Sequence, residues 1–257
     1  MKELLSSGQT ITINEMQMYY VSHGQGEPLV LLHGYTGASG DWEVFLPDLA
    51  QEYHLIIPDL RGHGRSTNPS TAFTFRQAAL DVFALLDSLG IDQFKAIGMS
   101  GGGNTLLHMA TQQPGRVAAM ALVSAASYYP GQSRTIMRNY TEDKLTDDEW
   151  RVHRQRHHYG DEQIRALLLH GRGFGDEYHD MNFIPPYLAT IQARTLIVSG
   201  DRDPLVPLHI AVEMFTAIPH SYLYIVPNGG HLPVFYHLRD PFIKNALPFL
   251  REDWDQK

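Results

Sequence analysis

The stretch AIGMSGGGN, residues 96–104, places a single serine, Ser100, among four glycines. It follows the apolar residues 94–97 and leads directly into the helical pattern NTLLHMATQQ. Gly98 and Gly102 complete the pattern Gly-x-Ser-x-Gly around the serine. A sharp turn between a strand and a helix strains its central residue and leaves room only for glycine two positions to either side. The stretch therefore predicts a strand–turn–helix junction with Ser100 at its apex.

This position gives the Ser100 hydroxyl a chemical advantage. The dipole and free amides of a helix N-terminus favour the negative charge that develops on a nearby oxygen during acyl transfer. The five-residue pattern also occurs in turns with a purely structural purpose, but its place between a strand and a helix favours catalysis. Ser100 is the candidate nucleophile.

Short apolar runs alternate with longer amphipathic segments on both sides of this junction. A helix is expected from Thr74, a plausible N-cap, to Gly90. This rhythm predicts an α/β fold with a mostly parallel sheet wrapped by helices. Strands are expected at residues 18–23, 28–34, 54–59, 94–99, 117–124, 193–200 and 221–227.

One segment interrupts the rhythm. About 70 residues separate the strand ending near Ser124 from the next strand, far more than an ordinary connection needs. Helices are expected within it at residues 139–160, 161–173 and 181–192. The interpretation is a helical cap at residues 126–190, inserted into a core formed by residues 1–125 and 191–257.

The length of 257 residues suits one large domain, and the net charge of −8 argues against a nucleic acid as partner. The N-terminus lacks a signal-peptide pattern, and no window approaches the roughly 18 apolar residues of a membrane helix. With no cysteine, the chain has no disulfide and no thiol nucleophile. A cytoplasmic protein with no membrane partner is expected; the oligomeric state is left open.

Polar residues at the carboxyl ends of the expected strands supply partners for the serine. A serine hydroxyl needs a base, and a histidine held by a carboxylate is the usual solution. His231, in NGGHLP, follows the last strand, and GDRDPLVP offers Asp201 and Asp203 on one loop. Asp203 is preferred because it lies farther beyond the strand end, whereas Asp201 is expected to brace the loop.

The order Ser100, Asp203, His231 resembles that of the α/β-hydrolase family. The motifs LLHGYTG, DLRGHGRS, GMSGGG, GDRDPLVP and NGGHLP match family signatures in sequence order over essentially the whole chain. The resemblance implies a sheet of about eight strands, a lid of variable sequence, and an oxyanion hole formed by the backbone amides of Tyr35 and Gly101. Gly101 departs from the Met or Leu often found at its position.

These features predict a serine hydrolase that cleaves a carboxylic ester of small to medium size, with a small-molecule substrate and no cofactor. Alternatives of the same fold are a thioesterase, a lactonase, a hydrolase of C–C bonds and a small-molecule receptor with little turnover. Haloalkane dehalogenases and epoxide hydrolases of this fold carry Asp where Ser100 stands, which disfavours both. The run GMSGGG also lacks the spacing of a dinucleotide-binding loop.

Candidate substrate-binding residues are Tyr35, Met99, Tyr128 and Trp150. Aromatic side chains in the cap suggest an apolar roof for the pocket, but they could equally form the cap's own small core. That choice is left open.

The remaining histidines have structural interpretations. His33 and His63 are expected to brace the loops beside the site. His153 and His157 have the i, i+4 spacing of metal ligands on a helix, but no third ligand has a convincing spacing. A solvated face of the cap is expected instead, with no metal.

Overall fold

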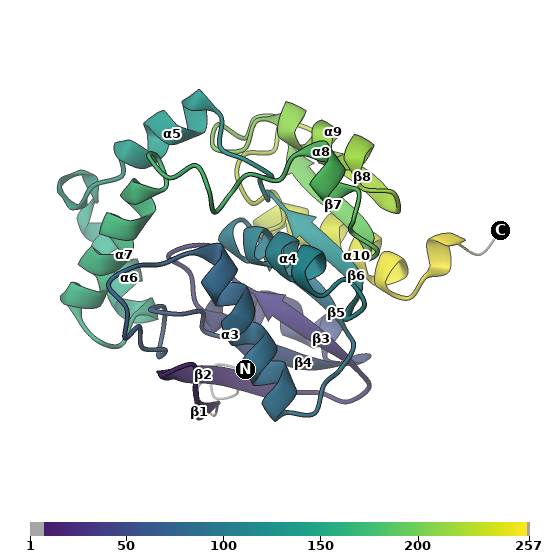
Figure 1. Cartoon of the computed structure of the whole chain (residues 1–257), viewed down its shortest axis with the longest axis horizontal. Coiled ribbons are helices and arrows are strands. Elements are labelled where there is room, and N and C mark those ends of the chain that lie inside the picture. Colours follow the sequence, from purple (N-terminus) through teal and green to yellow (C-terminus); the bar gives the residue numbers. More distant parts are fainter. Residues whose placement is uncertain (1–7, 256–257) are drawn as a thin grey trace.

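A computed structural model describes residues 8–255, which form one eight-stranded sheet flanked by helices (Figure 1). The strand order is β1-β2-β4-β3-β5-β6-β7-β8, with β2 antiparallel to β1 and β4 and all other pairs parallel. The predicted α/β class and mostly parallel sheet are confirmed. The strands are β1 Gln9–Ile13, β2 Met16–His23, β3 Glu27–Leu32, β4 Tyr53–Pro58, β5 Phe94–Met99, β6 Val117–Val123, β7 Arg194–Gly200 and β8 Ser221–Val226.

The edge strand β1 was missing from the sequence interpretation. Its residues QTITI are mostly exposed, and only Ile13 is buried. β1 therefore lacks the continuous apolar run that marks the central strands, and its pairing with β2 holds it in place.

Helices cover both faces of the sheet and enclose two apolar clusters. The first cluster lies beneath α3 Phe75–Ser88, α4 Gly101–Gln112 and α9 Leu208–Ala217, and the second beneath η1 Ser39–Phe45, α2 Leu46–Leu49 and α10 Arg239–Leu250. Thr74 caps α3 as predicted, because its hydroxyl accepts a hydrogen bond from the Gln77 amide at 3.0 Å. Short 3-10 turns η3 Tyr236–Leu238 and η4 Asp253–Asp255 flank α10.

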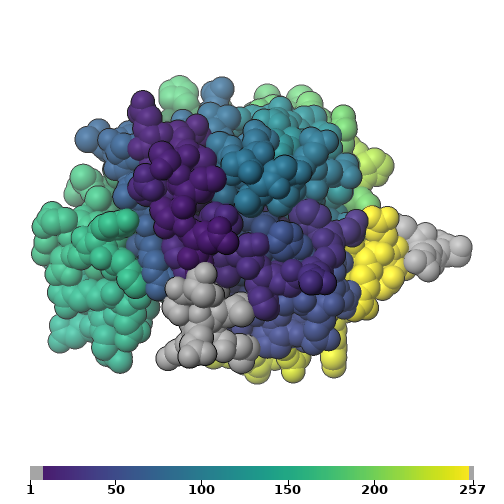
Figure 2. Space-filling view, turned by 90° about the horizontal axis from the view of Figure 1, so that it is seen from below, coloured from purple at the N-terminus to yellow at the C-terminus, as the bar shows by residue number. Residues whose placement is uncertain are grey.

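The helical insertion lies between β6 and β7, and we call it the cap. It comprises α5 Gly131–Arg138, η2 Glu142–Lys144, α6 Asp147–Arg156, α7 Asp161–Gly173 and α8 Pro185–Leu188. In Figure 2 the green cap helices α6 and α7 form one end of the molecule, and the yellow C-terminal helix lies toward the opposite end.

Cap helices differ from the sequence expectation in three places. α5 was not expected. The helix expected at 139–160 is confined to α6, because a capping box between Thr146 and Glu149 starts it late. The helix expected at 181–192 is only the four residues of α8. The domain boundaries at 126 and 190 stay predictions.

None of the helices within residues 8–255 is long and apolar enough to cross a membrane.

A buried ion pair fixes the loop that follows β4. Arg61 donates to the two carboxylate oxygens of Asp81 on α3, at 2.7 and 2.8 Å, and both side chains are almost inaccessible to solvent. Asn14 and Gln77 donate to the same carboxylate. The loop that follows β4 is therefore attached to α3 by the buried Arg61–Asp81 ion pair, whose charges are fully paired.

We predict that Asp81→Ala lowers the free energy of unfolding by about 3–5 kcal/mol, because it leaves the Arg61 charge buried and unpaired. Asp87→Ala is the matched control on the same helix. Asp87 pairs with Arg116 at 2.7 Å but is 64% exposed, so its removal should cost at most about 1 kcal/mol. Urea unfolding of the three proteins measures both values, and equal losses would contradict the prediction.

Candidate active site

Ser100 occupies a strained turn between β5 and α4. Its backbone has φ 48° and ψ −113°, outside the regions that an ordinary residue prefers. A Cβ atom on Gly98 would lie 2.6 Å from the Gly102 backbone, and one on Gly102 would lie 2.2 Å from the Leu32 carbonyl oxygen. The two glycines are required because backbone segments approach each other at these points.

Ser100, His231 and Asp203 are brought together at the carboxyl edge of the sheet. His231 Nε2 lies 2.9 Å from Ser100 Oγ, and His231 Nδ1 lies 2.7 Å from Asp203 Oδ2. An ionised carboxylate can only accept, so Nδ1 carries the proton and Nε2 is free to accept one from the serine. The three groups form one continuous chain of hydrogen bonds.

The two aspartates of the loop after β7 have different surroundings. The Asp203 side chain is fully buried, and its Oδ1 accepts hydrogen bonds from the Leu205 and Val206 amides at 2.8 and 2.9 Å. Asp201 Oδ1 makes no hydrogen bond among the described residues and lies 3.9 Å from Arg202 Nε. The expectation that Asp201 braces this loop was wrong, because Asp203 both braces it and contacts the histidine.

The Tyr35 and Gly101 amides lie beside Ser100 and are adjacent to each other. Gly101 is the first residue of α4, where an amide has no partner within the helix. A Cβ atom on Gly101 would lie 3.0 Å from the Tyr35 amide nitrogen and 3.0 Å from the Phe75 ring. A larger residue at 101 would therefore press on both neighbours, which explains the departure from the family pattern.

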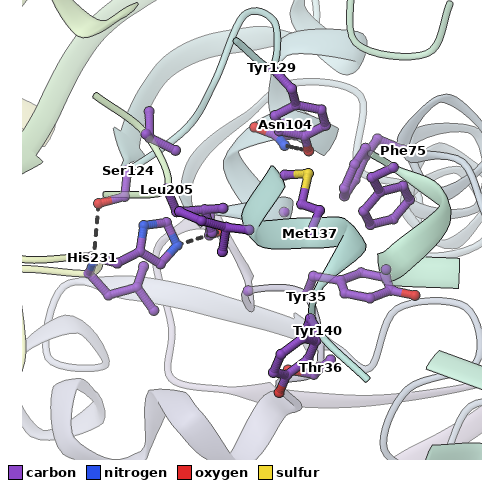
Figure 3. A pocket seen from close by; sticks show the side chains of 18 residues that line it. Tyr35, Thr36, Phe75, Asn104, Ser124, Tyr129, Met137, Tyr140, Leu205 and His231 are labelled. Atoms are coloured by element: carbon purple, nitrogen blue, oxygen red, sulfur yellow. Dashed lines mark hydrogen bonds between the residues drawn. The ribbon is translucent and has the colours of Figure 1, made fainter. Parts of the chain in front are cut away.

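A cavity of about 350 Å³ opens above Ser100, between the sheet edge and the cap. Figure 3 shows His231 on one side of it, Tyr35 and Phe75 on the other, and Asn104 hydrogen-bonded to Tyr129 at the top. No Asp, Glu, Lys or Arg is among the described residues that line it. The lining is Gly34, Tyr35, Thr36, Phe75, Ser100, Gly101, Asn104, Ser124, Tyr129, Ile136, Met137, Tyr140, Gly171, Phe174, Leu205, Val206, His231 and Leu232.

Of the four expected substrate-binding residues, only Tyr35 lines this cavity. Met99 is a core residue, 1% exposed, that borders the neighbouring cavity. Tyr128 points away and donates to Glu213, and Trp150 lies against Arg154 and Arg165 of the cap. Met99, Tyr128 and Trp150 therefore lie outside the lining of this cavity, because side-chain direction in these segments depends on packing rather than on local sequence.

The cap aromatics divide between the cavity and the main core. Tyr129 and Phe174 line the cavity, whereas Phe183 is buried in the first apolar cluster and stacks on Tyr187 at 5.4 Å. Ser124 was missed, although it stands directly at the end of β6. Its hydroxyl accepts a hydrogen bond from the Leu232 amide at 3.1 Å, next to His231.

Four histidines form a buried row from the core into the cap. Ring centroids are 5.1 Å apart for His33 and His63, 6.1 Å for His63 and His157, and 5.8 Å for His157 and His153. His33 bridges the Gly34 carbonyl and the Leu60 amide, and so it lies between two core loops, in the place expected for a brace. The solvated face expected for His153 and His157 was wrong, since both are at most 5% exposed.

Burial lowers the pKa of every ring in this row. The effect brings the pKa of His157 to about 3 and holds that of His63 well below its usual range. Burial likewise lowers the pKa of His33 and of His153. The row is therefore neutral near pH 7. Among residues 8–255, no group of three or more acidic or histidine side chains is arranged to hold a metal ion.

Comparison with known proteins places the chain among hydrolases. The family model for the alpha/beta hydrolase fold matches residues 27–145. A 2-hydroxy-6-oxo-6-(2'-aminophenyl)hexa-2,4-dienoic acid hydrolase from Metapseudomonas resinovorans is 26% identical over 251 residues, covering 90% of this chain and 86% of that protein. A soluble epoxide hydrolase from Corynebacterium sp. (strain C12) is 43% identical over only 98 residues, 38% of this chain and 34% of that protein.

Among solved structures, the meta-cleavage product hydrolase from Pseudomonas fluorescens IP01 (CumD) superposes with a TM-score of 0.78. The match has 22% sequence identity and covers 96% of this chain and 98% of that one. This likeness supports the fold, including the helical insertion after β6.

We predict that the buried histidines make the protein less stable as the pH falls below about 6.5, the value for an unfolded chain. Between that pH and the lowered native pKa values, the unfolded state binds more protons than the native state, so stability rises with pH. Urea unfolding at pH 7.5 and 5.5 measures the difference. His157→Gln removes one of these rings and should show a smaller loss, and an identical loss in both proteins would contradict the assignment.

Proposed function

The chain belongs to the α/β-hydrolase fold family, and on that premise we propose that it is a serine hydrolase cleaving carboxylic esters of small to medium size. One observation carries the proposal: the hydrogen-bonded chain Asp203–His231–Ser100 ends at the floor of an apolar cavity. A nucleophile, a base and an orienting acid with this geometry are the parts that acyl transfer requires.

The proposed reaction begins when Ser100 Oγ attacks the ester carbonyl carbon. His231 Nε2 takes the hydroxyl proton and then returns it to the leaving alcohol, so an acyl-enzyme remains on Ser100. Asp203 keeps the proton of His231 on Nδ1 and stabilises the imidazolium that forms transiently. A water molecule, activated by His231 in the same way, releases the carboxylic acid.

The oxyanion is assigned to the Tyr35 and Gly101 amides. Gly101 begins α4 next to Ser100, and the Tyr35 amide of the loop after β3 lies beside Gly101, where the helix dipole adds to the effect of both amides. Hydrogen bonds that strengthen as charge develops on the carbonyl oxygen lower the barrier selectively, and one such donor is typically worth about 3 kcal/mol.

The composition of the cavity favours a neutral substrate. Its walls are mostly aromatic and aliphatic, and the Asn104 and Tyr129 side chains at its far end are hydrogen-bonded to each other at 2.7 Å. A volume of about 350 Å³ is near the lower end of the range for small-molecule sites. Thioesters and lactones fit the same machinery.

Hydrolysis of a C–C bond is the second candidate, and the relatives favour it. The substrate named for the Metapseudomonas resinovorans enzyme is a dienoic acid, which carries a carboxylate at neutral pH. Arg156 borders the neighbouring cavity and already pairs with Asp41 at 2.8 Å. A carboxylate would compete with Asp41 for it, so the ester remains the leading substrate.

We predict sustained release of p-nitrophenol from its acetate, butyrate and octanoate esters by the wild type and none above background by Ser100→Ala. The substitution removes only one oxygen, so the thermal unfolding midpoint should stay close to that of the wild type. Turnover by a folded Ser100→Ala protein would refute the nucleophile. A single stoichiometric burst would favour a receptor, and faster cleavage of 2-hydroxy-6-oxo-6-phenylhexa-2,4-dienoate would favour C–C chemistry.

We predict that Asp203→Asn lowers kcat by roughly 10⁴-fold, because an amide in its place no longer fixes the tautomer of His231. Asp201→Asn, two residues away on the same loop, is the matched control and should change kcat by less than about tenfold, since Asp201 does not contact the histidine. Steady-state kinetics on p-nitrophenyl butyrate measure kcat for both variants. A larger loss of kcat in Asp201→Asn than in Asp203→Asn would assign the role of the acid to Asp201.

A further inference from the structure

We propose that the cap holds the oxyanion hole in its working geometry, with His157 and Arg156 at the end of α6 acting as positioning residues for the Tyr35 amide. The inference rests on the proposed function, in which that amide binds the oxyanion. It makes catalysis, and not only substrate access, depend on where the cap lies.

The turn that carries the Tyr35 amide is short and strained. The Gly37 amide donates to the Gly34 carbonyl at 2.9 Å, which closes a turn across Tyr35 and Thr36. Thr36 has φ 63°, in the left-handed region that β-branched residues avoid. Because the turn does not favour this conformation by itself, contacts from outside must hold it.

His157 of the cap is hydrogen-bonded to this turn. Its Nδ1 lies 3.1 Å from the Gly64 amide nitrogen, which can only donate, so Nδ1 is the acceptor. The ring proton is therefore on Nε2, which donates to the Thr36 carbonyl at 3.1 Å. His157 is buried, with 2% of its surface exposed, so it links two core loops and fixes the peptide between Thr36 and Gly37.

Arg156 holds the same loop one step farther along. Its guanidinium contacts Asp41 at 2.8 Å, and the other carboxylate oxygen of Asp41 accepts the Ala38 amide at 3.2 Å. The last residue of α6 and its C-cap therefore act together on residues 36–41.

A second cap helix holds Tyr35 itself. The Tyr35 hydroxyl donates to the Leu167 carbonyl of α7 at 2.8 Å, and its ring lies edge-on to Phe174 at 4.8 Å. A Cβ atom on Gly171 would lie 2.9 Å from this ring, so α7 packs directly on it. Tyr35, which supplies the amide, is thus fixed by α7 through its side chain and by α6 through the carbonyl of the following residue, Thr36.

The test compares His157→Leu with His157→Gln and with His170→Leu. Glutamine retains an amide nitrogen near the place of Nε2, so it should restore part of the loss. His170 is the matched control. Its Nε2 also lies near a core carbonyl, that of Thr71 at 2.8 Å, but Thr71 is outside residues 34–41, the loop that carries the Tyr35 amide. Thermal unfolding reports on the fold of each variant.

Two readouts separate positioning from general packing. For p-nitrophenyl butyrate, His157→Leu should lower kcat by about 10²-fold, the cost of misplacing an oxyanion donor, with KM nearly unchanged. The affinity for butylboronic acid, which accepts the Ser100 oxygen to form a tetrahedral adduct while the serine proton passes to His231, should fall by a similar factor. His170→Leu should change neither quantity.

Equal losses in His157→Leu and His170→Leu, or a change in KM alone, would overturn the proposal. Should His157→Leu fail to fold, Arg156→Gln is measured instead, and unchanged kcat and boronate affinity there would overturn it equally. Boronate binding needs Ser100 and the amides but no ester turnover. A wild type that binds the boronate yet cleaves no ester would refute the proposed function, and the variants would still test the positioning role by their boronate affinities.

Discussion

The conformation of Ser100 is the constraint on which the rest of the structure depends. A residue with φ 48° between a strand and a helix is stable only when the neighbouring backbone segments lie almost in contact, which Gly98 and Gly102 allow. That contact places the end of β3, and with it Tyr35, beside the start of α4. Ser100 and the Tyr35 and Gly101 amides therefore share one rigid unit formed by β3, β5 and α4.

Backbone strain gathers along the same edge of the sheet. Besides Ser100, positive φ angles occur at Thr36 after β3, Ser124 after β6 and Leu232 after β8. These residues all line the cavity, and the Ser124 hydroxyl holds the Leu232 amide beside His231. Strained residues persist only where their surroundings fix them, so the buried sheet stabilises an edge that the loops alone would not form. This arrangement positions groups before a substrate arrives.

Substrate specificity is determined by features other than the strained turns at the edge of the sheet. The chain resembles proteins named as hydrolases of a dienoic acid, of a meta-cleavage product and, over a shorter segment, of an epoxide, and a fold alone does not select among such reactions. The cap supplies part of the cavity wall, where its Tyr129, Met137 and Phe174 present rings and a thioether but no charge. The cap also contacts the Thr36 carbonyl through His157, so one segment lines part of the cavity and supports the groups assigned to the transition state.

The sequence by itself determined the α/β fold and the candidates Ser100, Asp203, His231 and Tyr35, because each stands at a strand end whose neighbours largely fix its backbone and direction. It did not determine β1, the true bracing role of Asp203, or the directions of Tyr128 and Trp150. Nor did it reveal that His157 is buried. The α6 sequence is polar, and the partners of His157, Gly64 and Thr36, lie 93 and 121 residues away in the chain. Only the tertiary structure decided these features, because burial and side-chain direction in the cap arise from packing against distant loops.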